Sequence, residues 1–346
     1  MIETLRPYSQ QLTTPAFDDV AELVSFMGAI QAQDIDMCKW AVGMRLKQPS
    51  LSHVREAIDS GRIIRTHIMR PTWHLVVAED IRWILSLCGE RLRAAYMKSW
   101  WKHYEIDAEM YSRFRDTTGR LLAGTEGLTI QELTAALNDT GYIWNQDQVK
   151  SMIATGEVEG FICNGREKSR KSTLDERVPA IPEISKEEAL SLLALKYFRS
   201  HSPASLKDFI WWSGLTTTEA KAAVGSLGTA LIMDRYEGEK LLVHESCVGD
   251  YSSDEQVYLL PPYDEYLISY ADRGHVLSPK HAAKAHNNFG IFQPVILYKG
   301  KIAGNWKKVT KKGDIEIETS FFEKTGAPGK RKLQVAIDRY LRFLKE

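Results

Sequence analysis

Cysteine is scarce in this sequence, and no spacing pairs one cysteine with another. The 346 residues include four cysteines, Cys38, Cys88, Cys163 and Cys247, which lie far apart. No Cys-x-x-Cys occurs, so neither a zinc knuckle nor a dithiol redox site is indicated. We therefore interpret all four as reduced, structural cysteines of a cytoplasmic protein.

Long apolar runs are also missing. No window approaches the roughly 20 uncharged apolar residues that a membrane helix needs, and the first six residues lack the basic-then-apolar layout of a signal peptide. We expect no membrane partner and a cytoplasmic location. With 44% apolar and 26% charged residues the composition is that of an ordinary globular protein. The length suffices for two to three domains.

The chain has no net charge, because 45 lysines and arginines balance 45 aspartates and glutamates. This balance argues against a protein that coats nucleic acid non-specifically. The basic residues are nevertheless clustered, which is compatible with a local positive groove. The clusters are Arg166, Lys168, Arg170 and Lys171, then Lys299, Lys301, Lys307, Lys308, Lys311 and Lys312, then Lys330, Arg331 and Lys332.

Several catalytic signatures are absent as well. The sequence has no glycine-rich phosphate loop, no Gly-x-Ser-x-Gly elbow and no His-Glu-x-x-His, so nucleotide hydrolysis, serine hydrolysis and zinc proteolysis have little support. His67 and His74 lie on adjacent expected strands, where they could face one another. A metal site would need further ligands, which the sequence does not offer at matching positions. We expect no metal and no cofactor.

What the sequence does contain is a recurring order of elements. Helices are expected at 15–30, 35–47 and 51–60, followed by strands at 63–69 and 72–77. Three helices followed by a two-stranded ribbon are typical of a winged helix, which is a helix-turn-helix with a β hairpin added.

The same order returns further along the chain. Connecting helices at 89–104 and 108–123 precede a helix opened by the capping box Thr129-x-x-Glu132, a helix at 145–154, a strand at 158–163 and a basic loop at 164–172. A third copy has helices at 189–198, 205–213 and 216–228 and a hairpin of 231–236 and 240–244. The tail has strands at 257–260, 294–298, 301–308 and 314–321 and an amphipathic helix at 332–345.

These patterns predict an α+β fold of tandem winged-helix (helix-turn-helix with β hairpin) units plus a C-terminal antiparallel β-rich segment. The predicted units are 1–104, 105–182 with a basic wing, 183–250, and the segment 251–346 with its final helix. Each unit could also serve as an ordinary structural or protein-contact module, because fold alone does not decide function.

The tripeptide Gln31-Ala32-Gln33 lies between the first two expected helices. Two glutamines cannot act as strong bases, but their amides can orient one water molecule. This equipment suits a substrate whose leaving group is already activated. Taken alone, such a tripeptide is more often a solvated surface or a local amide cap.

Four motifs that follow one another along the chain favour a functional interpretation of this tripeptide. They are Gly28–Gln33, then Ile64–Val76 with Arg65-Thr66 and Arg70-Pro71-Thr72-Trp73-His74, then Leu259-Leu260-Pro261-Pro262-Tyr263-Asp264, then Gly304-Asn305-Trp306. Together they resemble the winged-helix DNA glycosylases of the AlkZ type, over nearly the whole chain. The resemblance implies a concave DNA-binding surface, excision of alkylated purines, and a water positioned by Gln31 and Gln33. Crosslink unhooking in that family also depends on a β hairpin, which the sequence does not identify here.

Excision of an alkylated purine requires only weak catalytic groups, such as two glutamine amides. Alkylation at purine N7 or N3 makes the base a cation that leaves as a neutral molecule, so the enzyme must mainly bind the lesion and aim a water at C1′. Asp34 and Asp36 are candidate electrostatic partners of the developing sugar cation, although helix N-capping is the commoner role for such residues. His74 is expected to orient a site residue or to be structural.

DNA contacts are expected from basic residues and aromatic rings. Arg65 and Arg70 flank the first hairpin and are candidates for phosphate contacts. Arg166, Lys168, Arg170 and Lys171 of the second wing and Lys307 and Lys308 of the C-terminal strands join them. An aromatic ring could replace an extruded base. The candidates are Trp73, Trp100, Trp101 and Tyr104, for which a place in the core is the commoner outcome.

The sequence thus predicts a monomeric DNA N-glycosylase that acts on double-stranded DNA carrying alkylated bases. Crosslink unhooking is a further activity that the resemblance implies. One alternative is a non-catalytic DNA-binding regulator, which usually dimerises and reads spaced half-sites. The other alternative is a scaffold whose winged helices bind proteins and show no salt-dependent DNA affinity.

Overall fold

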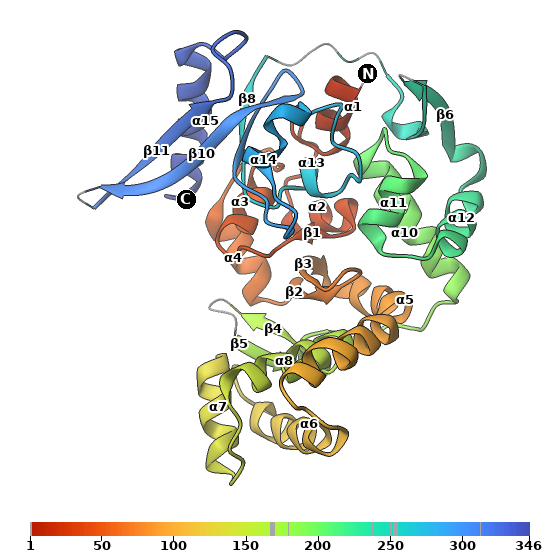
Figure 1. The fold of residues 1–346 in the computed structure, drawn as a ribbon, viewed down its shortest axis with the longest axis vertical. Coiled ribbons are helices and arrows are strands. Elements are labelled where there is room, and N and C mark those ends of the chain that lie inside the picture. The colour runs from red at the N-terminus through yellow and green to blue at the C-terminus, as the bar shows by residue number, and fades with distance from the viewer. Residues whose placement is uncertain are drawn as a thin grey trace. The chain divides into compact units, whose positions relative to one another are not determined.

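The chain divides into two compact units. The computed structural model describes residues 2–166, 170–178, 180–236, 238–249, 251, 255–311 and 313–346. Unit 1 comprises Met1–Val54 and Ser191–Glu346, and unit 2 comprises Arg55–Leu190 (Figure 1). Both mix helices with antiparallel sheet, which confirms the α+β class. The division into four consecutive units stays a prediction.

Unit 1 begins with short helices that set the position of the glutamine pair. They are α1 (Ile2–Ser9), α2 (Val20–Met27), α3 (Met37–Gly43) and the start of α4 (Leu51–Asp59), with the short strand β1 (Ile30–Gln31) between α2 and α3. Helix α2 is shorter than the expected 15–30. The Asp19 carboxylate caps its start by accepting the N–H groups of Ala21 and Glu22, and Gly28 ends it with a φ of 79°.

A helix-and-hairpin segment follows the return of the chain to unit 1. It consists of α10 (Lys186–His201), α11 (Leu206–Ser213), α12 (Thr217–Ser226), β6 (Leu231–Tyr236) and β7 (Glu239–His244). Capping boxes at Ser205 and Thr216 start α11 and α12, and Gly214 in the left-handed conformation ends α11. The expected order of helices and hairpin is confirmed in this segment.

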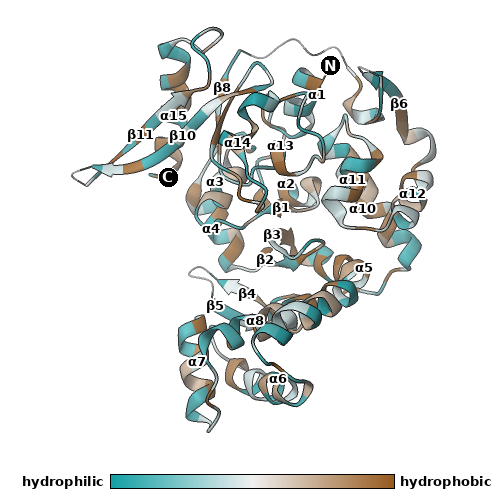
Figure 2. Cartoon of the chain, viewed as in Figure 1, coloured by the Kyte–Doolittle hydropathy of each residue, from teal (hydrophilic) through white to brown (hydrophobic). Residues whose placement is uncertain are grey.

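The C-terminal part of unit 1 is a four-stranded antiparallel sheet with the order β11-β10-β9-β8. Its elements are β8 (Val257–Leu260), α13 (Glu265–Ile268), α14 (Ala282–Ala285), β9 (Val295–Tyr298), β10 (Lys301–Lys311), β11 (Asp314–Phe321) and α15 (Lys330–Phe343). Figure 2 shows hydrophilic and hydrophobic residues interleaved along α15. Its apolar face is buried, and the Tyr340 ring lies 5.1 Å from Trp40 and 5.0 Å from Trp306.

Unit 2 is built on a hairpin that the sequence places well. Strands β2 (Ile63–Ile68) and β3 (Thr72–Val77) pair antiparallel, and β2 also pairs with β4 (Ile162–Arg166), which pairs with β5 (Arg170–Thr173). The helices are α5 (Ala78–Tyr96), which continues as the π-helix Met97–Trp101, then α6 (Ala108–Leu122), α7 (Ile130–Asp139), α8 (Gln146–Val158) and α9 (Leu174–Arg177).

Two expectations for unit 2 were wrong in their boundaries. The strand expected at 158–163 begins only at Ile162, because α8 runs to Val158 and Gly160, with a φ of 71°, reverses the chain before the strand. The helix expected to begin at 89 begins at Ala78, directly after β3. The capping box at Thr129 is confirmed.

The expectations about the cysteines and about membrane-spanning helices can be compared with the structure. All four cysteines are buried and free of disulfides, as expected for structural thiols. Within the described ranges, no helix has the length and apolarity needed to cross a bilayer.

Candidate active site

A buried carboxylate binds the backbone of Gln31, the first residue of the glutamine pair. Gln31 lies in β1 with 3% of its surface exposed, and its backbone N–H donates to Oε1 of Glu265 at 2.5 Å. Glu265 is the first residue of α13, whose N-cap is Asp264. The sequence Pro-Pro-Tyr-Asp therefore has a local function, because it starts the helix that holds Glu265 against the Gln31 backbone.

The second oxygen of Glu265 faces a hydroxyl and an imidazole. It accepts the Ser269 hydroxyl and lies 3.6 Å from Nε2 of His201, which is fully buried. Burial lowers the pKa of His201, and the nearby Glu265 offsets this only in part. A neutral imidazole therefore faces the carboxylate at neutral pH. Sequence reasoning missed both residues, although Glu265 directly follows a quoted motif.

An ion pair next to Glu265 ties the same turn to Arg45, which follows the end of α3 and donates to the carbonyl of Ala41 in that helix. Arg45 donates from Nη1 and Nη2 to the two carboxylate oxygens of Asp264, at 2.9 and 2.8 Å. Arg45 is 0% exposed and also donates to the backbone oxygen of Gln10. A bidentate, fully buried pair restricts geometry strongly, so Asp264 and the helix that follows it have one position relative to α3.

Two indole groups fix strand β8, which leads into this turn. Trp40 donates from Nε1 to the carbonyl of Leu259, and Trp306 donates to the carbonyl of Leu260, both at 2.7 Å. A Cβ at Gly304 would lie 2.3 Å from the carbonyl oxygen of Ser320, so only glycine allows β11 to approach here. Three of the four motifs quoted from the sequence are thus parts of one packed assembly in unit 1.

The residues that follow Gln31 begin helix α3. Gln33 is half-buried. One carboxylate oxygen of Asp34 accepts the backbone N–H groups of Asp36 and Met37, both at 3.0 Å. The N-cap position of α3 is Asp36, whose side chain makes no capping hydrogen bond. Asp36 is exposed and lies 3.5 Å from the Lys39 ammonium.

The two histidines of the unit 2 hairpin do not face one another. In the β2–β3 register His67 is opposite Trp73, and His74 is opposite Thr66. The two histidines therefore occupy neighbouring pairs and point to opposite faces of the sheet. His74 is buried and its Nδ1 lies 3.0 Å from the carbonyl of Thr72.

His67 belongs instead to a buried cluster around Glu157 of α8. Its Nδ1 contacts Oε2 of Glu157, which also accepts the Trp73 indole N–H at 3.2 Å, while Lys171 donates to Oε1 at 2.7 Å. Burial raises the pKa of Glu157, but the charges of Lys171 and His67 outweigh this effect and lower it to about 2. The cluster links α8 with the β2–β3 and β4–β5 hairpins.

The burial of this cluster removes two residues from the expected DNA contacts. Lys171 is 1% exposed and bound to Glu157. Arg65 is 7% exposed, with its guanidinium 4.3 Å from the Trp73 ring centroid. An ammonium or guanidinium in such a position has little surface for a phosphate, so we do not propose either as a DNA contact.

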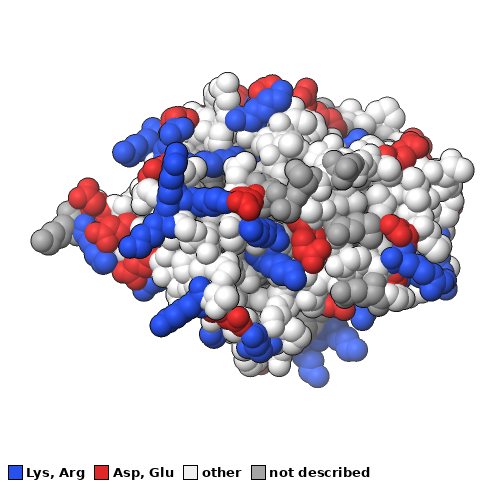
Figure 3. Space-filling model, turned by 90° about the horizontal axis from the view of Figure 1, so that it is seen from above, with Lys and Arg blue, Asp and Glu red and all other residues white. Residues whose placement is uncertain are grey.

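The other basic candidates are more accessible. Arg70 is half-buried and Lys308 is exposed. Arg166 pairs with Glu126 at 3.1 Å, Arg170 with Glu132 at 3.2 Å, and Lys307 with Glu318 at 2.9 Å. Lys168 lies outside the described residues. At the left of Figure 3, where the β10–β11 hairpin lies, basic and acidic side chains alternate, so the hairpin's lysines face carboxylates on their own surface.

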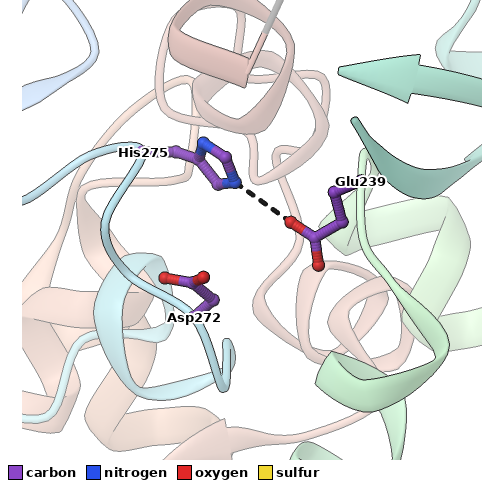
Figure 4. A group of neighbouring side chains, drawn as sticks. All are labelled: Glu239, Asp272 and His275. Carbon is purple, nitrogen blue, oxygen red and sulfur yellow. Dashed lines mark hydrogen bonds and ion pairs between the residues drawn. The ribbon is translucent and has the colours of Figure 1, made fainter. Parts of the chain in front are cut away.

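Three side chains of unit 1 have the donor types of a metal site. Glu239, Asp272 and His275 face a common space (Figure 4), with their ligand atoms within 4.8 Å of one another. Nε2 of His275 lies 3.1 Å from Oε2 of Glu239, and Asp272 accepts the Gly274 N–H at 2.8 Å. A hydrogen bond and a local turn account for these positions, so we assign no metal to the group.

Comparisons with known proteins point to one family of DNA glycosylases. A family model described as "DNA glycosylase AlkZ-like" matches residues 24–343. A curated protein of Streptomyces sahachiroi, "Interstrand DNA cross-link repair glycosylase", is 24% identical over 328 residues, which cover 88% of this chain and 85% of that protein. The solved structure of Streptomyces sahachiroi DNA glycosylase AlkZ matches with a TM-score of 0.77 at 20% identity, over 99% of this chain and 95% of that one.

That structural likeness shows a shared fold. The family model spans the Gln31 strand, the Glu265 turn and the Trp306 strand as well as all of unit 2. On this evidence the chain belongs to the AlkZ-like DNA glycosylase family.

Proposed function

We propose that this DNA glycosylase hydrolyses the N-glycosidic bond of N7- or N3-alkylated purines in double-stranded DNA, with Gln31 and Gln33 aiming the water. The observation that carries the proposal is the buried support under Gln31. A backbone N–H held by a carboxylate, itself fixed by an adjacent bidentate ion pair, gives the glutamine a defined starting position. Such pre-organisation is what a water-aiming residue needs.

The chemistry requires little proton transfer. An alkylated purine carries its own positive charge and leaves as a neutral base, while positive charge develops on the sugar. The side-chain carbonyls of Gln31 and Gln33 can accept hydrogen bonds from the water and direct its lone pair at C1′. The buried Glu265 accepts the backbone N–H of Gln31. It acts through the strand, so its role is positioning.

The DNA-binding part of the proposal rests on element order and on accessible basic residues. We interpret α10–α12 with β6–β7, and the helices with hairpins of unit 2, as tandem winged-helix units. Arg70, Arg166, Arg170, Lys307 and Lys308 are the proposed phosphate contacts. Lys168 keeps that role from the sequence alone. We also propose that the protein acts as a monomer, which light scattering of the purified chain would test.

Crosslink unhooking extends the same proposal. The Streptomyces sahachiroi relative carries the printed name of an interstrand cross-link repair glycosylase, and a crosslink through N7 positions is an alkylated purine on each strand. The long β10–β11 hairpin is the candidate for the hairpin on which this activity depends. Deleting its turn should then reduce unhooking more than release of a single methylated base.

The decisive experiment is a base-release assay on a duplex carrying one N7-methylguanine. The wild type should release the base, and the double variant Gln31→Ala, Gln33→Ala should not, while binding the duplex with nearly unchanged affinity. Circular dichroism and fluorescence anisotropy serve as controls for folding and binding. Equal release by both proteins would remove the glutamines from the mechanism.

A sequence-specific footprint on undamaged DNA, together with no release from methylated or crosslinked duplexes, would favour the regulator alternative. Absence of any salt-dependent DNA affinity would favour the protein scaffold.

A further inference from the structure

A tight turn in unit 1 holds an aromatic ring almost entirely in solvent. The ring is Phe289, with 91% of its surface exposed, in the turn from Asn287 to Ile291 that follows α14. Ile291 beside it is 43% exposed. Exposed aliphatic residues are common singly, but a fully presented phenyl ring at the tip of a turn has no role in packing.

The turn is pre-organised by its own hydrogen bonds. The side-chain oxygen of Asn287 accepts the N–H groups of Phe289 at 3.0 Å and Ile291 at 3.1 Å. The Asn287 N–H donates to the Ile291 carbonyl at 3.0 Å, and Gly290 has a φ of 77°. A side-chain oxygen that replaces water on two backbone donors makes the loop rigid, so little backbone entropy is lost if Phe289 meets a ligand.

Both ends of the loop are fastened by the motif residue Asn305. Its side-chain NH₂ donates to the carbonyls of Lys284 and Pro294, at 3.1 and 3.0 Å. Those two residues flank the turn on either side, so one amide closes the base of the loop. The same motif supplies Trp306, which fixes strand β8.

The loop is also fastened to the segment that supports Gln31. Phe292, 6% exposed, lies 6.1 Å from the ring of Tyr263 and 5.1 Å from the guanidinium of Arg273. Tyr263 precedes Glu265 by two residues, and Glu265 binds the Gln31 backbone. In Figure 1, α13, α14 and β1 are drawn in the same part of unit 1, in agreement with these contacts.

We propose that Phe289 is a wedge that enters the DNA base stack beside the lesion and fills the space left when the alkylated purine is extruded. This inference rests on the proposed function. Enzymes that act on a base in a duplex must bring it out of the stack, and apolar side chains that insert between base steps are an established means of doing so. Asn288 and the exposed Lys284 offer polar and positive groups to the groove and the backbone around the ring.

Three of the four aromatic candidates offered by the sequence are placed differently. Trp101 is buried and donates to Thr155 at 3.0 Å, and Trp73 donates to Glu157. Trp100 is 36% exposed and stacks on Tyr96 at 4.4 Å. Each of these rings has a protein partner that it would have to leave, whereas Phe289 is already presented.

The test uses 2-aminopurine fluorescence, which rises when that base is unstacked. The probe duplex carries 2-aminopurine next to a 7-methylguanine made resistant to hydrolysis by a 2′-fluorine. Wild type and Phe289→Trp should raise the fluorescence on binding, and Phe289→Ala should not. Ile143→Ala is the matched control, because Ile143 is a 96% exposed apolar residue of unit 2, and it should behave as the wild type.

Single-turnover base release from an ordinary 7-methylguanine duplex gives the second readout. Phe289→Ala should be slower by about tenfold or more, in line with the contribution of one base–aromatic stack. The loss should shrink when the lesion lies opposite an abasic site, because that duplex is already opened. Phe289→Trp should retain most of the rate.

The outcomes separate the wedge from the proposed function. Unstacking by the wild type and not by Phe289→Ala supports the wedge even if no base is released, in which case only the proposed function fails. Three results would each overturn the wedge. They are unstacking by Phe289→Ala that equals that of the wild type, no unstacking by any of the proteins, and an equal loss of rate on paired and abasic duplexes. Capture of a second copy or another protein at Phe289, with no change in DNA stacking, would do the same.

Discussion

Each unit buries a glutamate, and the two are satisfied in different ways. Glu157 of unit 2 contacts Lys171 and His67, and these charges lower its pKa to about 2. Glu265 of unit 1 accepts a backbone N–H and a hydroxyl and faces His201, whose pKa burial lowers. Glu157 is matched by the ammonium of Lys171, whereas the Gln31 N–H and the Ser269 hydroxyl that Glu265 accepts are dipoles.

The difference suggests different uses of the same side chain. A buried carboxylate whose charge is matched by an ammonium links elements together, and its field is largely cancelled locally. A buried carboxylate that accepts a backbone N–H fixes the position of that segment of backbone. In this interpretation Glu157 stabilises unit 2, and Glu265 positions the strand that carries Gln31.

The largest effect is expected from removing the matched charge. Glu157→Gln leaves the Lys171 ammonium buried without its counter-charge, and breaking one side of a buried pair costs about 3–5 kcal/mol. Urea unfolding followed by circular dichroism should show a loss of this size. A double variant, Glu157→Gln with Lys171→Met, should recover much of the stability. A single variant as stable as the wild type would contradict a structural role for the cluster.

A smaller and different effect is expected at the other glutamate. Glu265→Gln can still accept the Gln31 N–H but has no charge, so the unfolding free energy should change little while single-turnover base release slows. A rate loss of about 10- to 100-fold is in the range of a misplaced or weakened catalytic group. DNA affinity, measured by anisotropy, should be unchanged. A variant that loses stability but keeps its rate would reverse the contrast between the two units.

Acid should affect the two clusters in separate pH windows. The pKa of His201 is lowered from 6.5 by burial, so below pH 6.5 the unfolded chain binds a proton that the folded chain does not. Stability then falls with decreasing pH, by at most about 1.4 kcal/mol per pH unit for one group. For Glu157, with a pKa lowered from 4.5 to about 2, the stabilisation is complete above pH 4.5 and is lost towards pH 2.

The His201 window can be isolated with one variant. Unfolding free energies of the wild type and His201→Gln, measured between pH 5 and 8, should differ in slope below pH 6.5. His244 and His286, whose pKa values burial also lowers, remain in both proteins and cancel in the comparison. Parallel curves would show that His201 gains its proton as readily in the folded chain as in the unfolded one.

The sequence predicts local structure well where the signal is local. Three local features depend on only a few neighbouring residues, and each is confirmed. They are the capping box at Thr129, the β2–β3 hairpin and the glycine at the end of α11. The end of α8 was wrong because Val158 and Phe161 have the β-branched and aromatic character of a strand, whereas helix packing extends α8 through Val158.

The support of the site is less accessible from the sequence, because it depends on distant partners. Glu265 and Gln31 are 234 positions apart, and Arg45 and Asp264 are 219 apart. The quoted motifs mark these regions but do not show which atoms meet. Lys171 illustrates the opposite problem. It belongs to a basic run that predicts a DNA contact, and only the fold reveals that its ammonium is buried against Glu157.

The smallest effect is expected where charges are paired on the surface. Lys307 and Glu318 face each other across β10 and β11, with 67% and 40% of their side chains exposed, so removing either should change stability little. DNA affinity tests the role of Lys307 more sharply than stability does. If Lys307 contacts a phosphate, Lys307→Ala should reduce the slope of log affinity against log salt by about one. Glu318→Ala, which frees the lysine, should strengthen binding at low salt, whereas equal slopes for all three proteins would place the hairpin outside the DNA contact.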